Sequence, residues 1–189
     1  MNIANIIKTR CYESPVGVLM MGAVGERLCL CDWMGKKDRS DVDKRLQRIL
    51  GAVFEEGTTP AVEKAMRQLD EYFAGRRRQF DVPLLLAGTA FQKTVWNELL
   101  RIPFGETLSY AETAQRAGCP KAVRAVAHAI SSNALSLFVP CHRIIGSNRS
   151  MTGYRGGTET KRLLLQWEGS ADSNCLSALQ YIHTPGNID

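Results

Sequence analysis

The 189-residue sequence has no long hydrophobic run. No stretch approaches the roughly 18 consecutive apolar residues of a membrane-spanning helix, and the N-terminus lacks the basic segment and apolar run that mark a signal peptide. These absences argue against a membrane protein and against a secreted one. We therefore expect the protein to remain in the reducing cytoplasm.

Metal-ligand spacing is also missing. The three histidines, His128, His142 and His183, are too few and too scattered for a zinc site. The six cysteines show no compact spacing pattern, although a secreted protein could pair them; they are Cys11, Cys29, Cys31, Cys119, Cys141 and Cys175. We expect free thiols and no bound metal, with Cys29 and Cys31 alternating along a strand.

Apolar residues make up 44% of the chain, which is enough for a packed core, and the formal net charge is +5. Residues 88–168 contain ten Lys and Arg against five Asp and Glu, so this segment carries the whole excess. An ordinary solvated surface is one interpretation, and an anionic partner is the other. If the partner is a polyanion, it binds the second half of the chain.

The first half of the chain predicts strands followed by two helices. Short apolar runs alternate with turn residues over residues 10–33, which is typical of an antiparallel hairpin. Helical spacing then follows behind Ser40 as a candidate cap, through Asp43, Leu46, Ile49, Leu50, Val53 and Phe54. A second helix has Thr59 as its cap, Pro60 in its first turn and Gly75 as its end. Its apolar face consists of Val62, Met66, Leu69 and Phe73.

The character of the sequence changes from sheet to helix at Gly88, where we place a domain boundary. The prediction is an N-terminal domain over residues 1–87, a C-terminal domain over 88–170 and a tail of unassigned role over 171–189. The connection before the boundary carries Arg76-Arg77-Arg78. A solvated charge run is the preferred interpretation of this triplet, and a phosphate contact is the alternative.

The C-terminal domain predicts three helices, the last two forming a helix-turn-helix. Thr89 opens the first helix with a capping box, and Ser109 opens the second in the same way. We expect one side of the first helix in the core, namely Phe91, Val95, Trp96, Leu99 and Leu100. The second helix should end at Gly118, and Pro120 prepares the third.

The third helix has two distinct faces when it is projected at about 100° per residue. The face expected in the core consists of Val123, Val126, Ala127 and Ile130, beside a strip of Ala122, Ala125 and Ala129. Arg124 and His128 point away from the core. A strip of small residues lets a helix lie close to another surface, which is either a packed neighbour or a nucleic-acid groove.

A nucleophilic cysteine is indicated where an apolar run is interrupted. Residues 135–139 predict a buried strand, and Pro140 then stiffens the chain just before Cys141. A buried cysteine is often only a small hydrophobic residue. Here, however, His142 offers a base and Arg143 a positive charge, and both favour the thiolate. Adjacent residues of an extended chain point to opposite faces, so His142 would reach the sulfur only through a turn or a water.

Pro140-Cys141-His142-Arg143 followed by two aliphatic residues resembles the active-site signature of the O6-alkylguanine-DNA alkyltransferases, the methylated-DNA–protein-cysteine methyltransferase family. Other segments occur in the family's order and spacing across residues 88–169. They are Phe91 to Trp96, Ile102 to Glu106, Ser109-Tyr110, Val123 to Val126, Asn133, Thr152 to Tyr154 and Glu168-Gly169. Leu69 to Pro83 and the turn Ser14 to Gly17 resemble the family's N-terminal domain.

This resemblance implies an α/β fold and a reaction. The N-terminal domain would be a small antiparallel sheet with helices, ribonuclease-H-like, and the mainly helical C-terminal domain would contain a winged helix-turn-helix. The activity would be DNA repair by irreversible, single-turnover transfer of an alkyl group from O6-alkylguanine, with O4-alkylthymine as a further candidate substrate. No cofactor is needed, and the protein would be a monomer that joins the nucleoid when it binds double-stranded DNA.

The resemblance also implies catalytic roles. Cys141 would accept the alkyl group, and His142 would act as a base through a water. Glu168 would orient the imidazole, which is the logic of a nucleophile, base and orienting acid. Tyr110 would donate a proton toward the departing purine, and Asn133 would brace the turn before the active-site segment.

DNA contacts and a base pocket follow in the same way. Arg124 would occupy the space left by the extruded nucleotide, and the strip Ala122, Ala125 and Ala129 would face the minor groove. The backbone of Cys141 and Ile144 would read the base, and the pocket wall would include Tyr154, Arg155 and Gly156. Arg155 stands where small residues are common in the family, so it would add a phosphate contact or narrow the pocket.

Three other functions compete with this one. A non-catalytic relative that binds alkylated DNA and recruits repair factors would lack the acceptor, and Cys141 argues against it. A DNA-binding regulator would use the helix-turn-helix alone and have no purpose for the Pro-Cys-His-Arg segment. A thiol hydrolase would turn over repeatedly, which separates it from a single-turnover acceptor.

Overall fold

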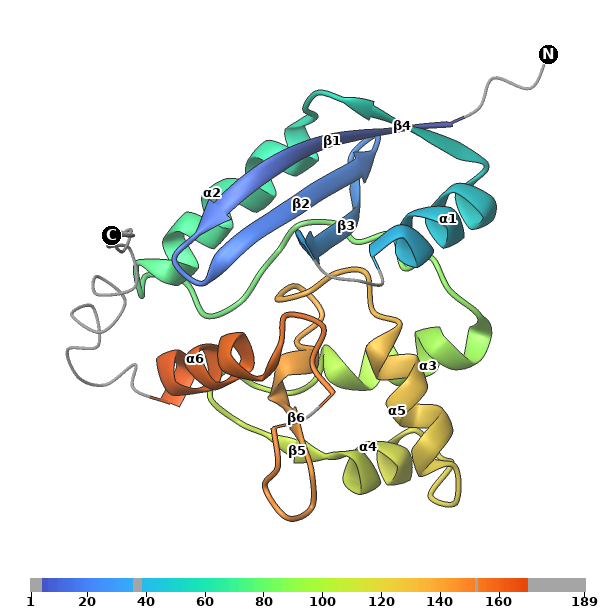
Figure 1. Cartoon of the computed structure of the whole chain (residues 1–189), viewed down its shortest axis with the longest axis vertical. Coiled ribbons are helices and arrows are strands. Elements are labelled where there is room, and N and C mark those ends of the chain that lie inside the picture. Colours follow the sequence, from blue (N-terminus) through green and yellow to red (C-terminus); the bar gives the residue numbers. More distant parts are fainter. Residues whose placement is uncertain (1–4, 36–38, 152, 170–189) are drawn as a thin grey trace, which may run out of the picture.

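The computed structural model describes residues 5–35, 39–151 and 153–169, and the predicted tail lies outside these residues. Figure 1 shows a sheet with two helices in the upper half and a mainly helical lower half. This arrangement confirms the α/β fold class and the order of a sheet domain followed by a helical one. Among the described residues, no helix is long and apolar enough to cross a membrane.

The N-terminal sheet has four strands in the order β3-β2-β1-β4. β1 (Asn5–Ser14), β2 (Gly17–Val24) and β3 (Arg27–Trp33) are joined by tight turns and pair in antiparallel fashion, as the hairpin predicted over residues 10–33 requires. β4 (Ala52–Glu56) instead pairs parallel to β1 at the far edge, so the sheet is mixed and not wholly antiparallel. The crossover from β3 to that edge runs through a helix, as connections between parallel strands usually do.

That crossover helix, α1 (Arg39–Leu50), is shorter than its apolar spacing predicts. Gly51 has a φ of 57°, a conformation that glycine adopts at low cost, and it ends the helix. Val53 and Phe54 therefore belong to β4, and their helical assignment was wrong. Ser40 lies inside the helix and not at its cap.

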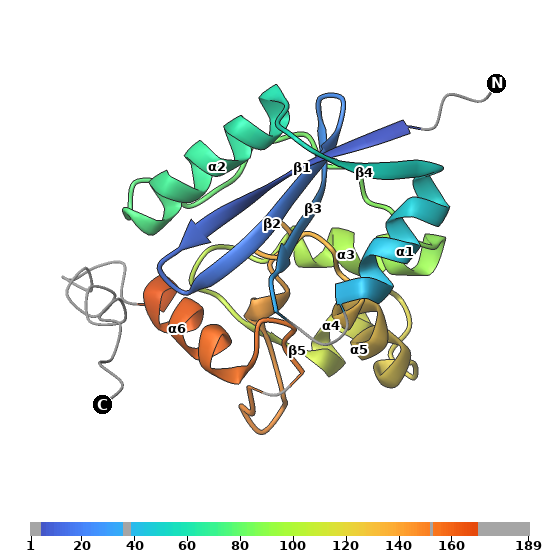
Figure 2. The same cartoon turned by 45° about the horizontal axis from the view of Figure 1, so that its top comes forward.

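α2 (Pro60–Phe73) matches its prediction. The Thr59 side chain accepts a hydrogen bond from the backbone N–H of Val62, and Pro60 occupies the first turn. The strands pass between α2 and α1 in the turned view of Figure 2, and the two helices contribute to separate apolar clusters. The connection that follows α2 makes a single β-bridge, between Leu84 and Leu28.

The C-terminal half begins with α3 (Ala90–Leu99), α4 (Tyr110–Arg116) and α5 (Val123–Ser131). Both predicted capping boxes are present, at Thr89 and Ser109. On α3 only Val95, Trp96 and Leu99 are buried. Phe91 and Leu100 are exposed, at 39% and 42%, so their expected core positions were wrong. Phe91 lies in the first turn of α3, and Leu100 is its C-cap.

The predicted strand over residues 135–139 does not form, although all five residues are buried. The chain makes turns there, because Leu137 has a φ of 71°, and only Leu135 bridges to a strand residue, Cys31. The 3-10 helix η1 (Cys141–Arg143) follows, then β6 (Ile144–Ile145), which pairs with β5 (Leu108–Ser109), and finally α6 (Thr158–Gly169).

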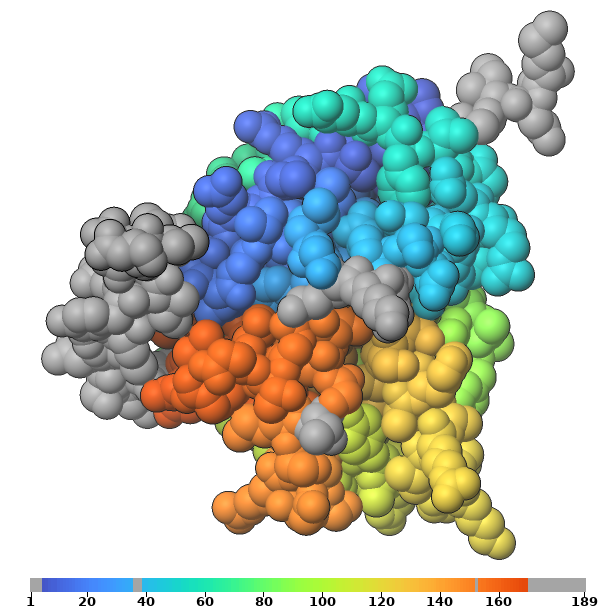
Figure 3. All heavy atoms as spheres, viewed as in Figure 1, coloured from blue at the N-terminus to red at the C-terminus, as the bar shows by residue number. Residues whose placement is uncertain are grey.

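One apolar cluster runs through both halves and unites them. It joins Tyr12 and Leu69 of the N-terminal half to Trp96, Val139 and Leu164 of the C-terminal half. In Figure 3 the blue and cyan atoms of the sheet half lie directly on the orange and yellow atoms below them. The nucleophile segment, residues 139–145, therefore lies in the interior at the junction of the two halves.

Candidate active site

Cys141 is a buried thiol held by its own turn and by Asn133. Its backbone N–H donates to the Val139 carbonyl at 2.8 Å, and Asn133 Nδ2 lies 3.3 Å from Sγ and 2.9 Å from the same carbonyl. Asn133 Oδ1 accepts from the backbone N–H of Leu135 at 2.9 Å. The structure thus brings Asn133 and Cys141 together, and one buried amide fixes both the turn and the sulfur.

Burial sets the protonation of this thiol. Burial raises the pKa of Cys141, and the hydrogen bond from Asn133 and the charge of Lys161 oppose that rise only in part. The resting side chain is therefore the thiol, which is a poor nucleophile compared with the thiolate. A base must remove the proton when the sulfur attacks.

His142, the next residue in the chain, is the candidate base, and its charge state suits that role. Burial lowers its pKa, against the opposing effect of Glu168, so the imidazole rests neutral and can accept a proton. Its Nε2 lies 2.9 Å from Glu168 Oε1, and its Nδ1 is buried with no hydrogen-bond partner in the described part of the chain. Nδ1 is therefore the ring nitrogen whose lone pair is available to accept a proton. Because η1 is a turn and not a strand, neighbouring side chains need not point to opposite faces.

Glu168 accepts more hydrogen bonds than the sequence suggests. Arg143 donates to both carboxylate oxygens at 2.8 Å, Tyr72 Oη donates to Oε1 at 2.9 Å, and the backbone N–H of Gly105 donates to Oε2 at 3.3 Å. Burial alone would raise its pKa, but His142 and Arg143 together hold that pKa well below its usual value. Glu168 is therefore a stable anion, and the Arg143 charge, expected to favour the thiolate directly, is paired with it.

Two of these residues were missed by sequence reasoning. Tyr72 lies on α2 of the N-terminal half and reads as an ordinary core aromatic, so no local signal identifies it. Lys161 is 1% exposed and donates from Nζ to the Ile144 carbonyl. Its position one helical turn before Leu164, on the face that also buries Glu168, was the available signal. Burial lowers the Lys161 pKa, and the nearby Cys141 opposes that shift.

Tyr110 and the segment after residue 152 lie close together near Cys141. Tyr110 is half-buried, and a Cβ on Gly153 would lie 3.0 Å from its hydroxyl, so that hydroxyl stands directly beside the glycine backbone. Burial raises the Tyr110 pKa and the Cys141 sulfur raises it further, so the phenol keeps its proton near the nucleophile. Tyr154 accepts a hydrogen bond from Trp33 Nε1 at 3.1 Å.

The other residues predicted for the base pocket make contacts of their own. A Cβ at Gly156 would lie 2.5 Å from the Tyr154 ring and 2.8 Å from Trp33 Nε1, so this glycine permits close packing of the two halves. Arg155 pairs with the buried Asp32 at 3.1 Å, across the junction of the halves. The pairing explains its presence without the expected phosphate contact or narrowed pocket. Ile144 is fully buried, and its carbonyl already accepts from Lys161.

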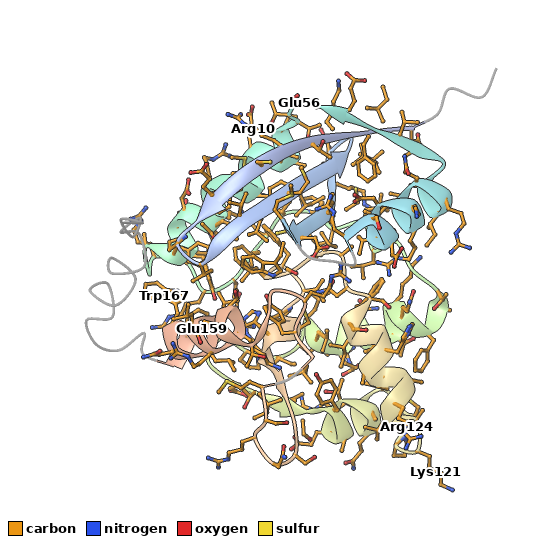
Figure 4. All side chains as sticks on the ribbon, viewed as in Figure 1. Arg10, Glu56, Lys121, Arg124, Glu159 and Trp167 are labelled. Atoms are coloured by element: carbon orange, nitrogen blue, oxygen red, sulfur yellow. The ribbon has the colours of Figure 1, made fainter. Side chains whose placement is uncertain are left out.

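The predicted nucleic-acid face of α5 is partly exposed. Arg124, Ala125 and His128 are exposed, and Lys121 and Arg124 project from the lower edge of the molecule in Figure 4. Ala122 is half-buried. Ala129 is only 1% exposed, and its carbonyl accepts a hydrogen bond from Trp96 Nε1 at 2.7 Å. The expectation that Ala129 faces a groove was therefore wrong, because this alanine packs α5 onto α3.

No metal site is evident in residues 5–35, 39–151 and 153–169, where no three His, Cys, Asp or Glu side chains gather as ligands. Cys11, Cys29, Cys31, Cys119 and Cys141 are free thiols. Cys29 and Cys31 lie on β3 as expected.

Comparisons with known proteins identify the family. Residues 7–86 match the family model "6-O-methylguanine DNA methyltransferase, ribonuclease-like domain", and residues 90–170 match "6-O-methylguanine DNA methyltransferase, DNA binding domain". The chain is 44% identical over 157 residues to the constitutive methylated-DNA–protein-cysteine methyltransferase of Bacillus subtilis, covering 82% of this chain and 92% of that protein. It is 43% identical over 160 residues to the Methanosarcina acetivorans protein of that name, covering 84% and 96%.

Solved structures show the same similarity. The O6-methylguanine methyltransferase of Mycobacterium tuberculosis superposes with a TM-score of 0.75 at 38% identity, over 91% of this chain and 98% of that one. The Mycobacterium tuberculosis OGT in complex with DNA also gives a TM-score of 0.75, at 37% identity over 93% and 99%. These similarities cover both halves of the chain together with the site between them, so the chain belongs to the 6-O-methylguanine DNA methyltransferase family.

Proposed function

We propose that this protein repairs DNA by transferring the alkyl group of an O6-alkylguanine to Sγ of Cys141. The observation that carries the proposal is the buried Cys141 thiol, held by Asn133 next to a His142–Glu168 pair and beside the Tyr110 phenol. This set supplies a nucleophile, a base, a fixed anion and an acid. The relatives that share 43–44% of their residues with this chain are named methylated-DNA–protein-cysteine methyltransferases.

In the proposed reaction, the Cys141 sulfur loses its proton and gains the alkyl group. The thiol proton passes to His142, directly or through a water, and Glu168 stabilises the imidazolium that forms. The sulfur then forms a bond to the alkyl carbon while the bond from that carbon to guanine O6 breaks. The product is a thioether, which has no simple route back to a thiolate, so each molecule reacts once.

The departing guanine needs a proton to leave as a neutral base. Tyr110 would donate it: its phenol keeps its proton in the resting site, and its hydroxyl lies beside Gly153. The imidazolium of His142 gives its proton to the Tyr110 phenolate, directly or through solvent, so both side chains return to their resting states. The whole reaction therefore has no net proton change and needs no cofactor.

DNA would bind along α5 with the damaged nucleotide turned out of the duplex. Chemistry on O6 requires this, because the atom is not accessible to a protein sulfur inside a stacked helix. Arg124 is exposed and projects from α5, so it can fill the space that the nucleotide leaves. The low bulk of Ala122 and Ala125 permits a close approach to the minor groove. We further propose that a monomer binds, and that residues 1–87 and 88–170 are its structural domains.

A stoichiometry experiment tests the function. The protein is incubated with duplex DNA that carries radiolabelled O6-methylguanine, and the label on the protein is counted. We expect one equivalent per molecule, and Cys141→Ala should abolish transfer while it still binds DNA. Repeated turnover would indicate a thiol hydrolase, and DNA binding without any labelling of the wild type would indicate the non-catalytic, recruiting relative. Label on Cys141→Ala would show that another residue accepts the group.

A further inference from the structure

A hydroxyl from the N-terminal half enters the catalytic network. Tyr72 lies on α2, is 1% exposed, and donates from Oη to Glu168 Oε1 at 2.9 Å. Its ring is held by aromatic neighbours, with centroids 5.0 Å from Phe73, 5.5 Å from Phe80 and 6.0 Å from Phe104. The ring is therefore enclosed by aromatic side chains, and its hydroxyl reaches α6 through the hydrogen bond to Glu168.

The position of this hydrogen bond distinguishes it from an ordinary core contact. Oε1 of Glu168 also faces His142 Nε2 at 2.9 Å and accepts from Arg143 Nη2 at 2.8 Å. The oxygen that orients the base is therefore shared with Tyr72. Removing the hydroxyl would change the charge density that the imidazole meets and the torsional freedom of the carboxylate.

We propose that Tyr72 is a positioning residue for alkyl transfer, whose hydroxyl fixes Glu168 Oε1 toward His142 and disperses its negative charge. The inference rests on the function proposed above. It also gives the N-terminal domain a role in the reaction, because the catalytic carboxylate is completed only when α2 is docked on α6. Tyr72 itself does not touch the reacting atoms.

The charged and titratable groups around Glu168 and His142 determine in which direction the loss of the Tyr72 hydroxyl shifts the pKa of His142. Glu168 and His142 are faced by Arg143 on η1, by Lys161 on α6 and by Tyr72 on α2, and the Tyr154 ring centroid lies 6.3 Å from that of His142. Burial and the nearby Glu168 raise the pKa of Tyr72 well above its usual value, so the phenol stays a donor throughout the neutral range. Without this donor, Glu168 attracts the imidazolium more strongly and the pKa of His142 rises. The base is then blocked by its own proton at a higher pH.

The test measures the single-turnover rate of transfer against pH for wild type and Tyr72→Phe, on duplex DNA containing O6-methylguanine. Phenylalanine keeps the ring and deletes only the hydroxyl. We expect the acid limb of the profile to move to higher pH by roughly half a unit to one unit. On that limb the rate should fall by about three- to tenfold, since each unit is a factor of ten.

Tyr12→Phe is the matched control. Tyr12 is also a buried tyrosine between the sheet and α2, and its hydroxyl donates to the Asp70 carboxylate at 2.8 Å, away from the site. It should lose a similar amount of thermal stability and keep the wild-type pH profile. Binding to undamaged duplex DNA shows whether each variant is folded. The affinity of Tyr72→Phe and that of Tyr12→Phe should both equal the wild-type affinity.

A double-mutant cycle with Glu168→Gln completes the test. Once the carboxylate charge is removed, adding Tyr72→Phe should cause no further shift of the acid limb, because the two residues act through one interaction. A Tyr72→Phe profile that is lowered equally at every pH, or is unchanged, would overturn the inference while leaving the proposed function intact. A wild type that takes no label would overturn the function itself.

Discussion

Asn133→Ala should weaken the fold and the reactivity of the nucleophile together. Asn133 is 1% exposed and makes three contacts: to the Val139 carbonyl at 2.9 Å, to the Leu135 N–H at 2.9 Å and to Cys141 Sγ at 3.3 Å. Alanine would leave the buried Leu135 N–H without its partner, while the Val139 carbonyl would keep only its hydrogen bond from the Cys141 N–H. At about 1–3 kcal/mol for the unsatisfied N–H and about 1 kcal/mol for the lost bond to the carbonyl, we expect a loss of roughly 2–4 kcal/mol in the free energy of unfolding.

The same substitution should raise the pKa of Cys141. The hydrogen bond from Asn133 lowers that pKa against the larger effect of burial, so its loss moves the thiol further from the thiolate. Unfolding in urea measures the loss of stability. The pH dependence of iodoacetamide labelling at Cys141 measures the change in its pKa, and the labelling midpoint should move to higher pH.

Ser132→Ala is the matched control for Asn133→Ala. Its hydroxyl donates to the His128 carbonyl at 2.8 Å in the same turn, and it makes no contact with the sulfur. It should cost about 1 kcal/mol and leave the labelling midpoint unchanged. If Asn133→Ala lost stability but kept the wild-type midpoint, the contact with Sγ would have no influence on the thiol. If stability did not change, Asn133 would not fix the turn.

Two other predictions follow from buried charges. Arg155→Ala leaves Asp32, which is 1% exposed, without its ion-pair partner, so we expect a loss of about 3–5 kcal/mol in urea unfolding; a change under 1 kcal/mol would contradict a buried pair at this junction. Stability should also fall as pH decreases. The folded pKa of His142 is lowered, so the stability that this residue contributes begins to be lost as pH falls through its unfolded pKa near 6.5. The folded pKa of Glu168 is also lowered, so the stability that Glu168 contributes is present above its unfolded pKa of about 4.3 and is lost as pH falls below that value. Glu168→Gln should flatten the curve of unfolding free energy below about pH 5, and an unchanged slope would argue against the depressed pKa of this carboxyl.

Local signals were enough for most of the fold. Thr59, Thr89 and Ser109 cap helices as their sequence contexts predict, because capping depends on residues only three positions apart. The errors arose where distant contacts or backbone geometry decide. Gly51 ends α1 although apolar spacing continues, and Leu137 turns the chain where an apolar run predicts a strand.

The contacts of the candidate site are also of two kinds, local ones that the sequence predicts and distant ones that it does not. Cys141, His142 and Asn133 are close in sequence, and their juxtaposition follows from one turn. Tyr72 meets Glu168 across 96 positions, and Asp32 meets Arg155 across 123, so neither contact leaves a local pattern. Ala129 was placed on the wrong face because helical projection gives an angle but does not say which neighbour covers it.

The state of the Cys141 sulfur after contact with damaged DNA is the most direct measurement of the account. The protein is mixed with an excess of an oligonucleotide duplex containing O6-methylguanine, digested, and its peptides are weighed by mass spectrometry. The account predicts that the peptide containing Cys141 gains the mass of one methyl group, and that the guanine in the oligonucleotide is restored. An unmodified Cys141 peptide beside repaired guanine would contradict it.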